Sequence, residues 1–170
     1  MKNFLCTIIL ILLSSYPVTA DASGGSIIVS EIQTYGVSAK DEFVRLYNPT
    51  SNTINISGWK LTKKTKSSNE SNLVSKFADG TNILANSYFL ITHKTDYRGT
   101  ETAGATFSGA SYSIANNNTI ILKNNSGVIV DKVGFGATSD YEGAPTNNPE
   151  NKRSIKRKNN QDTNNNKNDF

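Results

Sequence analysis

Few residues of this chain could perform acid–base or nucleophilic chemistry. The sequence has one histidine, His93, and one cysteine, Cys6. A hydrolase needs a nucleophile beside a positioned base, a pair of carboxylates, or a cluster of metal ligands. His93 has no second histidine with which to share a metal, and no Gly-x-Ser-x-Gly turn accompanies it. We therefore predict no catalytic residue, and we expect His93 to be an ordinary surface residue at the end of a strand.

Two adjacent carboxylates, Asp41 and Glu42, could serve as an acid–base pair or bind a cation. Side chains of adjacent strand residues point to opposite faces of a sheet. We therefore expect the two carboxylates to diverge, with Glu42 accepting hydrogen bonds from backbone or lysine donors. Asp131, near the second arm of a hairpin, is likewise expected to pair with a lysine or a loop amide.

One segment has the spacing of a calcium loop. Asp162, Asn164 and Asn166 carry side-chain oxygens at every second position, as calcium loops require. However, Lys167 stands where such loops have glycine, and no acidic residue follows at the distance of the closing bidentate ligand. The sequence leaves open a calcium site at these three residues. No cofactor is predicted.

Basic residues gather in two clusters. The first consists of Lys60, Lys63, Lys64 and Lys66, and the second of Lys152, Arg153, Lys156, Arg157 and Lys158. Such clusters can neutralise phosphates or anionic glycans, and binding would then weaken steeply with salt. The alternative interpretation is solvated charge that keeps an Asn-rich surface soluble. No aromatic residues alternate with the basic ones as in a single-strand-binding groove. The net charge of +4 permits attraction to polyanions without requiring it.

The N-terminus has the three parts of a secretory signal. Lys2 precedes an apolar run at residues 4–13, and Val18-Thr19-Ala20 supplies small or modest residues before a cleavage site. The apolar run is roughly half of the ~20 residues that span a bilayer. We predict cleavage after Ala20 and export to the cell envelope or exterior. Since Cys6 leaves with the signal, the mature chain would fold in an oxidising compartment without a disulfide.

The elements that position these residues are expected to be strands. Short β-branched and aromatic runs alternate with Gly, Asn, Ser and Pro, and no helical stripe is sustained. The expected strands are residues 27–33, 42–48, 53–57, 59–63, 72–77, 88–93, 118–123 and 128–135. Asn48-Pro49 should end the second strand, and Gly80 and Gly127 should sit in tight turns. The expected core includes Ile28, Phe43, Leu46, Trp59, Leu61, Phe89, Ile91, Ile120, Leu122, Val128, Val130 and Val133.

Three segments are expected to lie outside the strands. Residues 62–72 are polar and lysine-rich, which predicts a long exposed loop, and residues 95–109 predict another. Residues 146–170 are dominated by Asn and Lys, a composition typical of a flexible tail. Because the chain ends on Phe170, we hypothesise that this aromatic ring docks on the core and anchors the tail.

The order of four segments resembles the lamin-tail domain. These segments are residues 28–32, 41–50, 57–61 and 127–133. Their motif residues are Glu31, Asp41, Glu42, Phe43, Asn48, Pro49, Gly58, Trp59, Leu61, Gly127 and Asp131. The C-terminal segment also resembles an ending common among bacterial members. The resemblance lies in Arg157-Lys158, Asp162 to Asn166 and Asp169-Phe170.

The resemblance implies an all-β, immunoglobulin-like β-sandwich. It would occupy residues 25–145, after a signal peptide at 1–20 and before a polar extension at 146–170. Bacterial members of the family resemble accessory modules without a shared chemistry. The resemblance therefore implies a non-enzymatic exported module that binds or tethers another envelope or extracellular protein, or a cell-surface polymer. Loops at the ends of the sandwich would form the binding surface, or exposed sheet edges would pair with a partner's strand. The alternative is an accessory factor that binds nucleic acid or an anionic glycan through the lysine-rich clusters.

Overall fold

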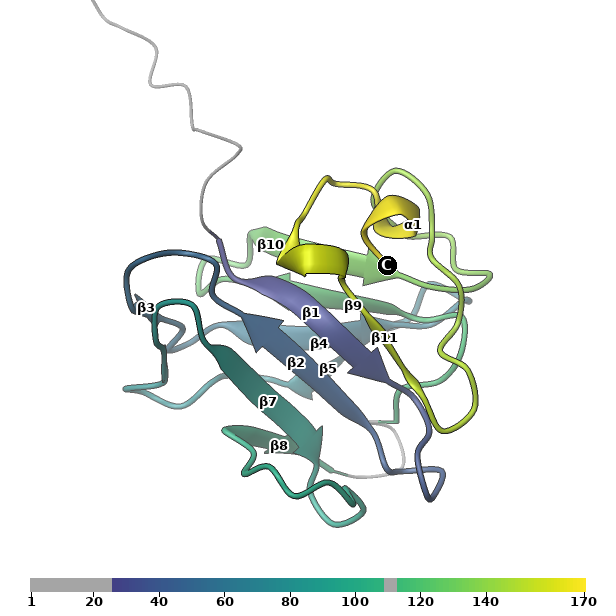
Figure 1. The fold of residues 1–170 in the computed structure, drawn as a ribbon, viewed down its shortest axis with the longest axis horizontal. Coiled ribbons are helices and arrows are strands. Elements are labelled where there is room, and N and C mark those ends of the chain that lie inside the picture. Colours follow the sequence, from purple (N-terminus) through teal and green to yellow (C-terminus); the bar gives the residue numbers. More distant parts are fainter. Residues whose placement is uncertain (1–25, 109–112) are drawn as a thin grey trace, which may run out of the picture.

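Short β-strands form two facing sheets in the computed structural model of the chain (Figure 1). The structure describes residues 26–108 and 113–170. The signal predicted at residues 1–20, with Cys6, lies outside these residues. Within the described part of the chain, no helix is long and apolar enough to cross a membrane. The predicted all-β, immunoglobulin-like sandwich is confirmed.

The first sheet has five strands, and its order brings the C-terminal segment beside the first strand. From one edge to the other the strands are β11 (Ser154–Lys156), β1 (Ile28–Gln33), β2 (Phe43–Tyr47), β7 (Tyr88–His93) and β8 (Ala105–Phe107). All neighbours are antiparallel except β7 and β8, which are parallel. Strand β11 is therefore an edge strand, with β1 as its only ladder partner among the described residues.

The second sheet has four antiparallel strands and covers the other side of the core. Its order is β10 (Ile129–Gly134), β9 (Thr119–Lys123), β4 (Lys60–Lys64) and β5 (Glu70–Val74). A separate two-stranded ladder joins β3 (Ile54–Asn55) to β6 (Asn82–Ile83). After β11 come a short 3-10 helix, η2 (Lys158–Asn160), and the terminal turn of helix, α1 (Asn166–Asp169).

A β-bulge sets the direction of the side chains in β1. Val29 and Ile32 are both fully buried, although strict alternation places residues three apart on opposite faces. The register of the β1–β2 ladder shifts between Val29 and Glu31, which inserts one extra residue and returns Ile32 to the core side. A second bulge lies in β10 between Ile129 and Asp131, after which Asp131 is buried.

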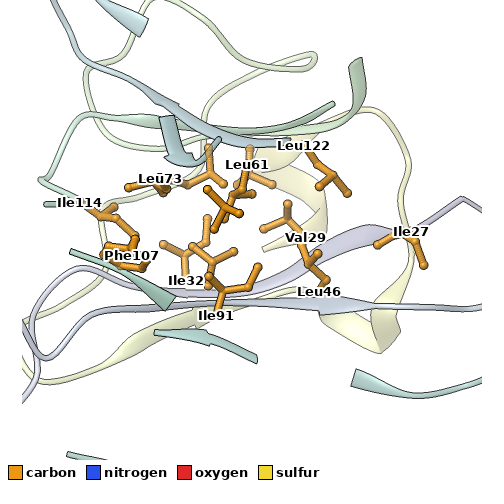
Figure 2. Packing of buried hydrophobic residues seen from close by; sticks show 14 of the residues in the cluster. Ile27, Val29, Ile32, Leu46, Leu61, Leu73, Ile91, Phe107, Ile114 and Leu122 are labelled. Atoms are coloured by element: carbon orange, nitrogen blue, oxygen red, sulfur yellow. The ribbon is translucent and has the colours of Figure 1, made fainter. Parts of the chain in front are cut away.

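The core lies between the two sheets and consists of aliphatic side chains with three phenylalanines (Figure 2). Burying each large apolar side chain stabilises the fold by about 1.5–3 kcal/mol. Most of the expected core residues are buried or pack against this cluster. Val128 is the exception, because it precedes β10 at the hairpin turn and is 60% exposed.

Local sequence signals located several strands and turns correctly. Strand β7 has the predicted bounds. Strand β2 ends at Tyr47, immediately before Asn48-Pro49. Gly80 and Gly127 have φ values of 83° and 81°, which glycine adopts without a Cβ clash.

The predicted loop at residues 62–72 is wrong. Strand β4 continues to Lys64 and β5 begins at Glu70, so only a short turn remains between them. The Thr65 N–H donates to the Asn69 carbonyl at 3.0 Å, and Ser68 has a φ of 67°. The polar residues of this segment belong to the strands: Glu70 and Asn72 face solvent, whereas Thr62 and Lys63 are buried with hydrogen-bond partners. In the same way, β8 lies within the predicted loop at 95–109, of which residue 109 lies outside the described residues.

The segment at residues 146–170 is integrated into the domain. Strand β11 extends the first sheet past the expected boundary at residue 145. Arg157 is buried, and Phe170 packs against the hydrophobic core cluster. The sandwich and its C-terminal segment therefore form one structural unit.

Candidate functional site

A pocket of about 810 Å³ opens beside the edge strand β11. The chain leaving β10 returns alongside β11 before it enters that strand (Figure 1). The pocket lining comes from these two segments and from the C-terminus. It consists of Gly136, Pro145, Thr146, Asn147, Asn148, Glu150, Arg153, Ser154, Ile155, Lys156, Lys158, Lys167 and Phe170. We call this feature the β11 pocket.

The charge of the β11 pocket is strongly positive. Arg153, Lys156, Lys158 and Lys167 line it, and Glu150 is its one acidic residue. Arg153 lies 3.7 Å from Glu150, with both side chains more than three-quarters exposed. In the described ranges, no carboxylate forms an ion pair with any of the three lysines. The pocket therefore has uncompensated positive charge, which attracts anionic groups.

The outer wall of the β11 pocket, residues 145–148, is held by the end of the second sheet. The Thr146 N–H donates to the Gly134 carbonyl at 3.0 Å, and the Gly136 N–H donates to the Thr146 carbonyl at 2.8 Å. The Asn148 side chain binds Asn117 twice, accepting from its N–H at 2.8 Å and donating to its side-chain oxygen at 3.1 Å. This wall is thus fixed without using β11.

The inner end of the pocket rests on a buried arginine. The guanidinium carbon of Arg157 lies 5.0 Å from the centre of the Phe170 ring, within cation–π distance. The Arg157 side chain is completely buried. Its Nε donates to the Val29 carbonyl at 3.0 Å, and its terminal nitrogens donate to Asp131 at 3.0 and 3.1 Å and to Asp169 at 2.6 Å. Arg157 therefore connects β1, β10 and the C-terminus.

The Asp131 carboxylate is surrounded by hydrogen-bond donors. Besides Arg157, the backbone N–H groups of Val29 and Lys132 donate to it at 2.5 and 2.7 Å. Burial raises the pKa of Asp131 to about 6, against the opposing attraction of Arg157. The carboxylate is therefore ionised at neutral pH and forms a buried ion pair with Arg157. We predicted a lysine or a loop amide as its partner, and this was wrong: the charged partner is an arginine distant in sequence, and the backbone N–H donors belong to strands β1 and β10.

The last residues are fastened by two polar side chains. Asp169 accepts hydrogen bonds from the Thr163 N–H at 3.1 and 3.2 Å. The Asn166 side-chain oxygen accepts from the N–H groups of Gly134 at 2.8 Å and Glu142 at 3.1 Å, and its amide nitrogen donates to the Lys132 carbonyl at 2.9 Å. These contacts hold Lys167 and Phe170 at the pocket.

Three carboxylates meet on the other side of Arg157. Oxygens of Asp131, Glu142 and Asp162 all lie within 4.8 Å of one another, a spacing that would suit a cation. Arg157 already supplies positive charge to two of them, donating to Asp162 at 3.1 Å. Burial, together with the carboxylates of Asp131 and Asp162, raises the pKa of Glu142 to about 7.

We expect Glu142→Gln to stabilise the protein relative to the wild type increasingly as the pH rises. The folded-state pKa of Glu142, about 7, lies above its ordinary value of 4.5. Its contribution to stability is therefore fully present below about pH 4.5 and is lost as the pH rises through about 7. Melting temperatures at about pH 5 and about pH 8 test this, with the variant's advantage larger at the higher pH. Glu150→Gln, the same change at an exposed side chain, is the control and should alter the melting temperature little. An equal effect of Glu142→Gln at both pH values would contradict the expectation.

The structure divides the second predicted basic cluster. Arg153, Lys156 and Lys158 line the β11 pocket, whereas Arg157 points into the interior and Lys152 is exposed outside the lining. Lys167 belongs to the pocket and was missed in the sequence. It is nine residues beyond Lys158, and only the fold of the C-terminal segment brings the two together.

The first predicted basic cluster does not form one surface. Lys63 is buried and donates to the Ser113 carbonyl, and burial lowers the pKa of its ammonium group. Lys64 pairs with Asp140 at 2.8 Å. Lys60 and Lys66 are exposed. Strand alternation in β4 separates these side chains, because neighbouring residues face opposite sides of the sheet.

The three residues considered for calcium use their oxygens within the protein. One Asp162 oxygen accepts from Arg157 at 3.1 Å and from the Asn164 N–H at 3.1 Å. The Asn166 oxygen accepts from two backbone N–H groups of other segments, and Asn164 is exposed. The alternating oxygens therefore face different partners, since the chain bends at Asn164, with a φ of 53°, and enters α1 at Asn166.

His93 is buried, and its prediction as a surface residue is wrong. The side chain is 3% exposed and meets the ring of Phe107 edge-on, with the ring centres 5.7 Å apart. Its Nδ1 lies 3.2 Å from a carboxylate oxygen of Asp96. Strand β8, which was not predicted, covers the histidine with Phe107.

Asp41 and Glu42 diverge as predicted. Asp41 accepts from the N–H groups of Val37 at 2.8 Å and Arg98 at 2.9 Å, whereas the buried Glu42 accepts from the Ile114 N–H at 3.1 Å. Burial raises the pKa of Glu42. Both residues fasten loops to strands and do not form a joint site.

The other motif residues also have structural contacts. Asn48 donates from its side-chain nitrogen to the carbonyls of Asn52, Ile83 and Leu84 at 2.8–3.0 Å. Gly58, with a φ of 76°, precedes β4 and its buried Leu61. Pro49 follows the end of β2, Trp59 packs against the core, and Glu31 accepts from Ser154 of β11 at 2.6 Å. These residues build the domain, and none of them lines the β11 pocket.

Comparison with known proteins identifies the sandwich. The family profile described as Lamin Tail Domain matches residues 20–137. No curated protein matches the chain. The matched range includes all four segments that carried the resemblance and ends before most of the residues that line the β11 pocket.

Proposed function

Because the chain belongs to the lamin tail domain family, whose domain is a non-catalytic structural unit, we propose that it is a non-enzymatic binding module for an anionic partner. The β11 pocket carries this proposal. Its lining combines four cationic side chains with a single acidic one. Clefts lined by one sign of charge raise the local concentration of oppositely charged ligands and speed their association.

The surroundings of the β11 pocket support a binding role. The outer wall is fixed by the second sheet, and the inner end rests on the Arg157 network. The main chain of a site supported in this way needs little ordering when a ligand binds, so the entropy cost falls on the exposed cationic side chains. The polar lining suits a charged ligand, which distinguishes this pocket from the apolar clefts that hold most small molecules.

The proposed place of action is the cell envelope or exterior. This proposal is supported by residues 1–20, in which a basic start is followed by an apolar run and then by small residues before a cleavage site. In that setting the anionic partner would be another envelope or extracellular protein, or an acidic cell-surface polymer. Nucleic acid remains the alternative ligand, since the same lysines could neutralise phosphates.

We expect reversal of pocket charge to weaken anion binding. In the double variant Lys156→Glu and Lys167→Glu, affinity for an acidic oligopeptide, a sulfated glycan or a DNA duplex should fall by about tenfold or more. The double variant Lys60→Glu and Lys66→Glu is the matched control, because both are exposed lysines of the other basic cluster and the change in net charge is the same. Fluorescence anisotropy of the labelled ligands with the full chain measures the affinities.

Two outcomes would contradict the proposed function. One is that none of the three ligands binds at low salt. The other is that the control variant Lys60→Glu and Lys66→Glu weakens binding as much as the pocket variant does, since the basic surface as a whole would then act without the pocket.

A further inference from the structure

Within residues 26–108 and 113–170, the edge of β11 that faces away from β1 is unpaired. Strand β11 is the first strand in the order of the five-stranded sheet, and its three residues pair with β1 alone. Edge strands present rows of main-chain N–H and C=O groups that can pair with an added strand.

The register of the β1–β11 ladder determines which main-chain groups of β11 face the free edge. The Arg157 N–H donates to the Ser30 carbonyl at 2.8 Å, toward β1. Main-chain groups of an antiparallel pair alternate in direction, so Ile155 also faces β1, whereas Ser154 and Lys156 face the opposite side. Across the described residues, the main-chain groups of Ser154 and Lys156 form no hydrogen bond to any segment outside the ladder. Both residues line the β11 pocket.

Residues 145–148, on the opposite wall of the pocket, form no hydrogen bond with these main-chain groups. Thr146 uses its N–H and its carbonyl to pair with Gly134 and Gly136, on the side of β10. A space therefore separates two segments of chain, one of which has free main-chain donors and acceptors. Such an arrangement fits β-augmentation, in which an extended peptide adds a strand to a sheet edge.

The side chains around this edge select the charge of the added strand. The Lys156 side chain is exposed, while Ile155 packs inward against the core. Arg153, Lys158 and Lys167 surround the same space. Lysine on an edge strand discourages indiscriminate pairing with other chains. An acidic segment would instead be attracted.

We infer that the β11 pocket binds an extended acidic peptide segment of another protein, which adds as a strand to the free edge of β11. This inference rests on the proposed anion-binding function and names its ligand class. Nucleic acid and glycans have no alternating peptide N–H and C=O groups to match Ser154 and Lys156. They would use the charge of the pocket alone.

The test uses a labelled peptide of about eight residues that alternates glutamate with valine, since a short extended segment covers the edge of β11. A second version has every peptide nitrogen methylated, which removes the N–H donors and keeps the charges. A DNA duplex and a sulfated glycan are measured in parallel. Binding is measured with the full chain, together with amide hydrogen exchange of Ser154 and Lys156.

A pair of variants tests the protein side of the same bonds. Ser154→Pro removes the N–H that faces the pocket, whereas Ser154→Ala keeps it. Both lose the hydroxyl that donates to Glu31, so the difference between them isolates the main-chain donor. Proline is tolerated on edge strands. If Ser154→Pro does not fold, the methylated peptide tests the inference alone.

The inference predicts that the acidic peptide binds and that methylation weakens it by about tenfold or more. It also predicts slower exchange at Ser154 and Lys156, and a loss of affinity in Ser154→Pro that Ser154→Ala does not show. Equal binding of the two peptides with unchanged exchange would overturn the inference and leave the anion-binding pocket intact. Binding of DNA or glycan without the peptide would do the same. No binding of any probe would overturn both.

Discussion

Replacing Arg157 with methionine is expected to lower the free energy of unfolding by about 3–5 kcal/mol, since removal of one partner leaves a buried charge uncompensated. The guanidinium group is fully buried between Asp131 and Asp169. Methionine fills much of the same space but donates no hydrogen bond. The Asp131 carboxylate would keep only its two backbone donors. Denaturant unfolding of the two proteins measures the difference.

Arg153→Met is the matched control for this prediction. The substitution is the same and lies four residues away, but the Arg153 side chain is 76% exposed. Surface changes of this kind alter stability by about 0.5 kcal/mol or less. Equal stability of Arg157→Met and the wild type would show that the C-terminal segment is not held by the buried ion pairs.

Replacing Leu61 with alanine is expected to destabilise the protein by about 2–5 kcal/mol, because it removes buried methyl groups and leaves a cavity. Leu61 is fully buried, lies on β4 between β9 and β5, and points into the core (Figure 2). Leu84→Ala is the control, since Leu84 is 62% exposed. Thermal or denaturant unfolding compares both variants with the wild type. Similar losses for the two leucines would contradict the assignment of the core.

The pattern of apolar and turn residues predicted most of the sandwich. Strand β7 was predicted to the residue because Tyr88 to His93 is a continuous β-forming run between turn residues. The loop predicted at residues 62–72 was wrong because polar residues of β4 are buried with partners that the sequence does not reveal: Thr62 donates to Glu70 and Lys63 to the Ser113 carbonyl. Strand β11 was missed because its three residues are stabilised by pairing with β1, more than a hundred positions away. Local composition cannot predict a contact between residues so far apart in the sequence.

The candidate site could be predicted only in part. The sequence indicated Arg153, Lys156 and Lys158 as members of a basic cluster. It could not show that Arg157, within the same run, points into the interior to meet Asp131. Nor could it join Lys167 to the pocket, because that contact depends on how Asp169 and Asn166 fold the chain end back onto the domain.

The β11 pocket is the proposed binding site for an acidic ligand. Titration of the isotope-labelled full chain with the acidic peptide, followed by backbone amide chemical shifts, tests this claim most directly. The largest shifts are expected at residues 146–148, at 153–158 and at 167–170. Shifts that are largest around Lys60 and Lys66, with the β11 pocket unaffected, would contradict it.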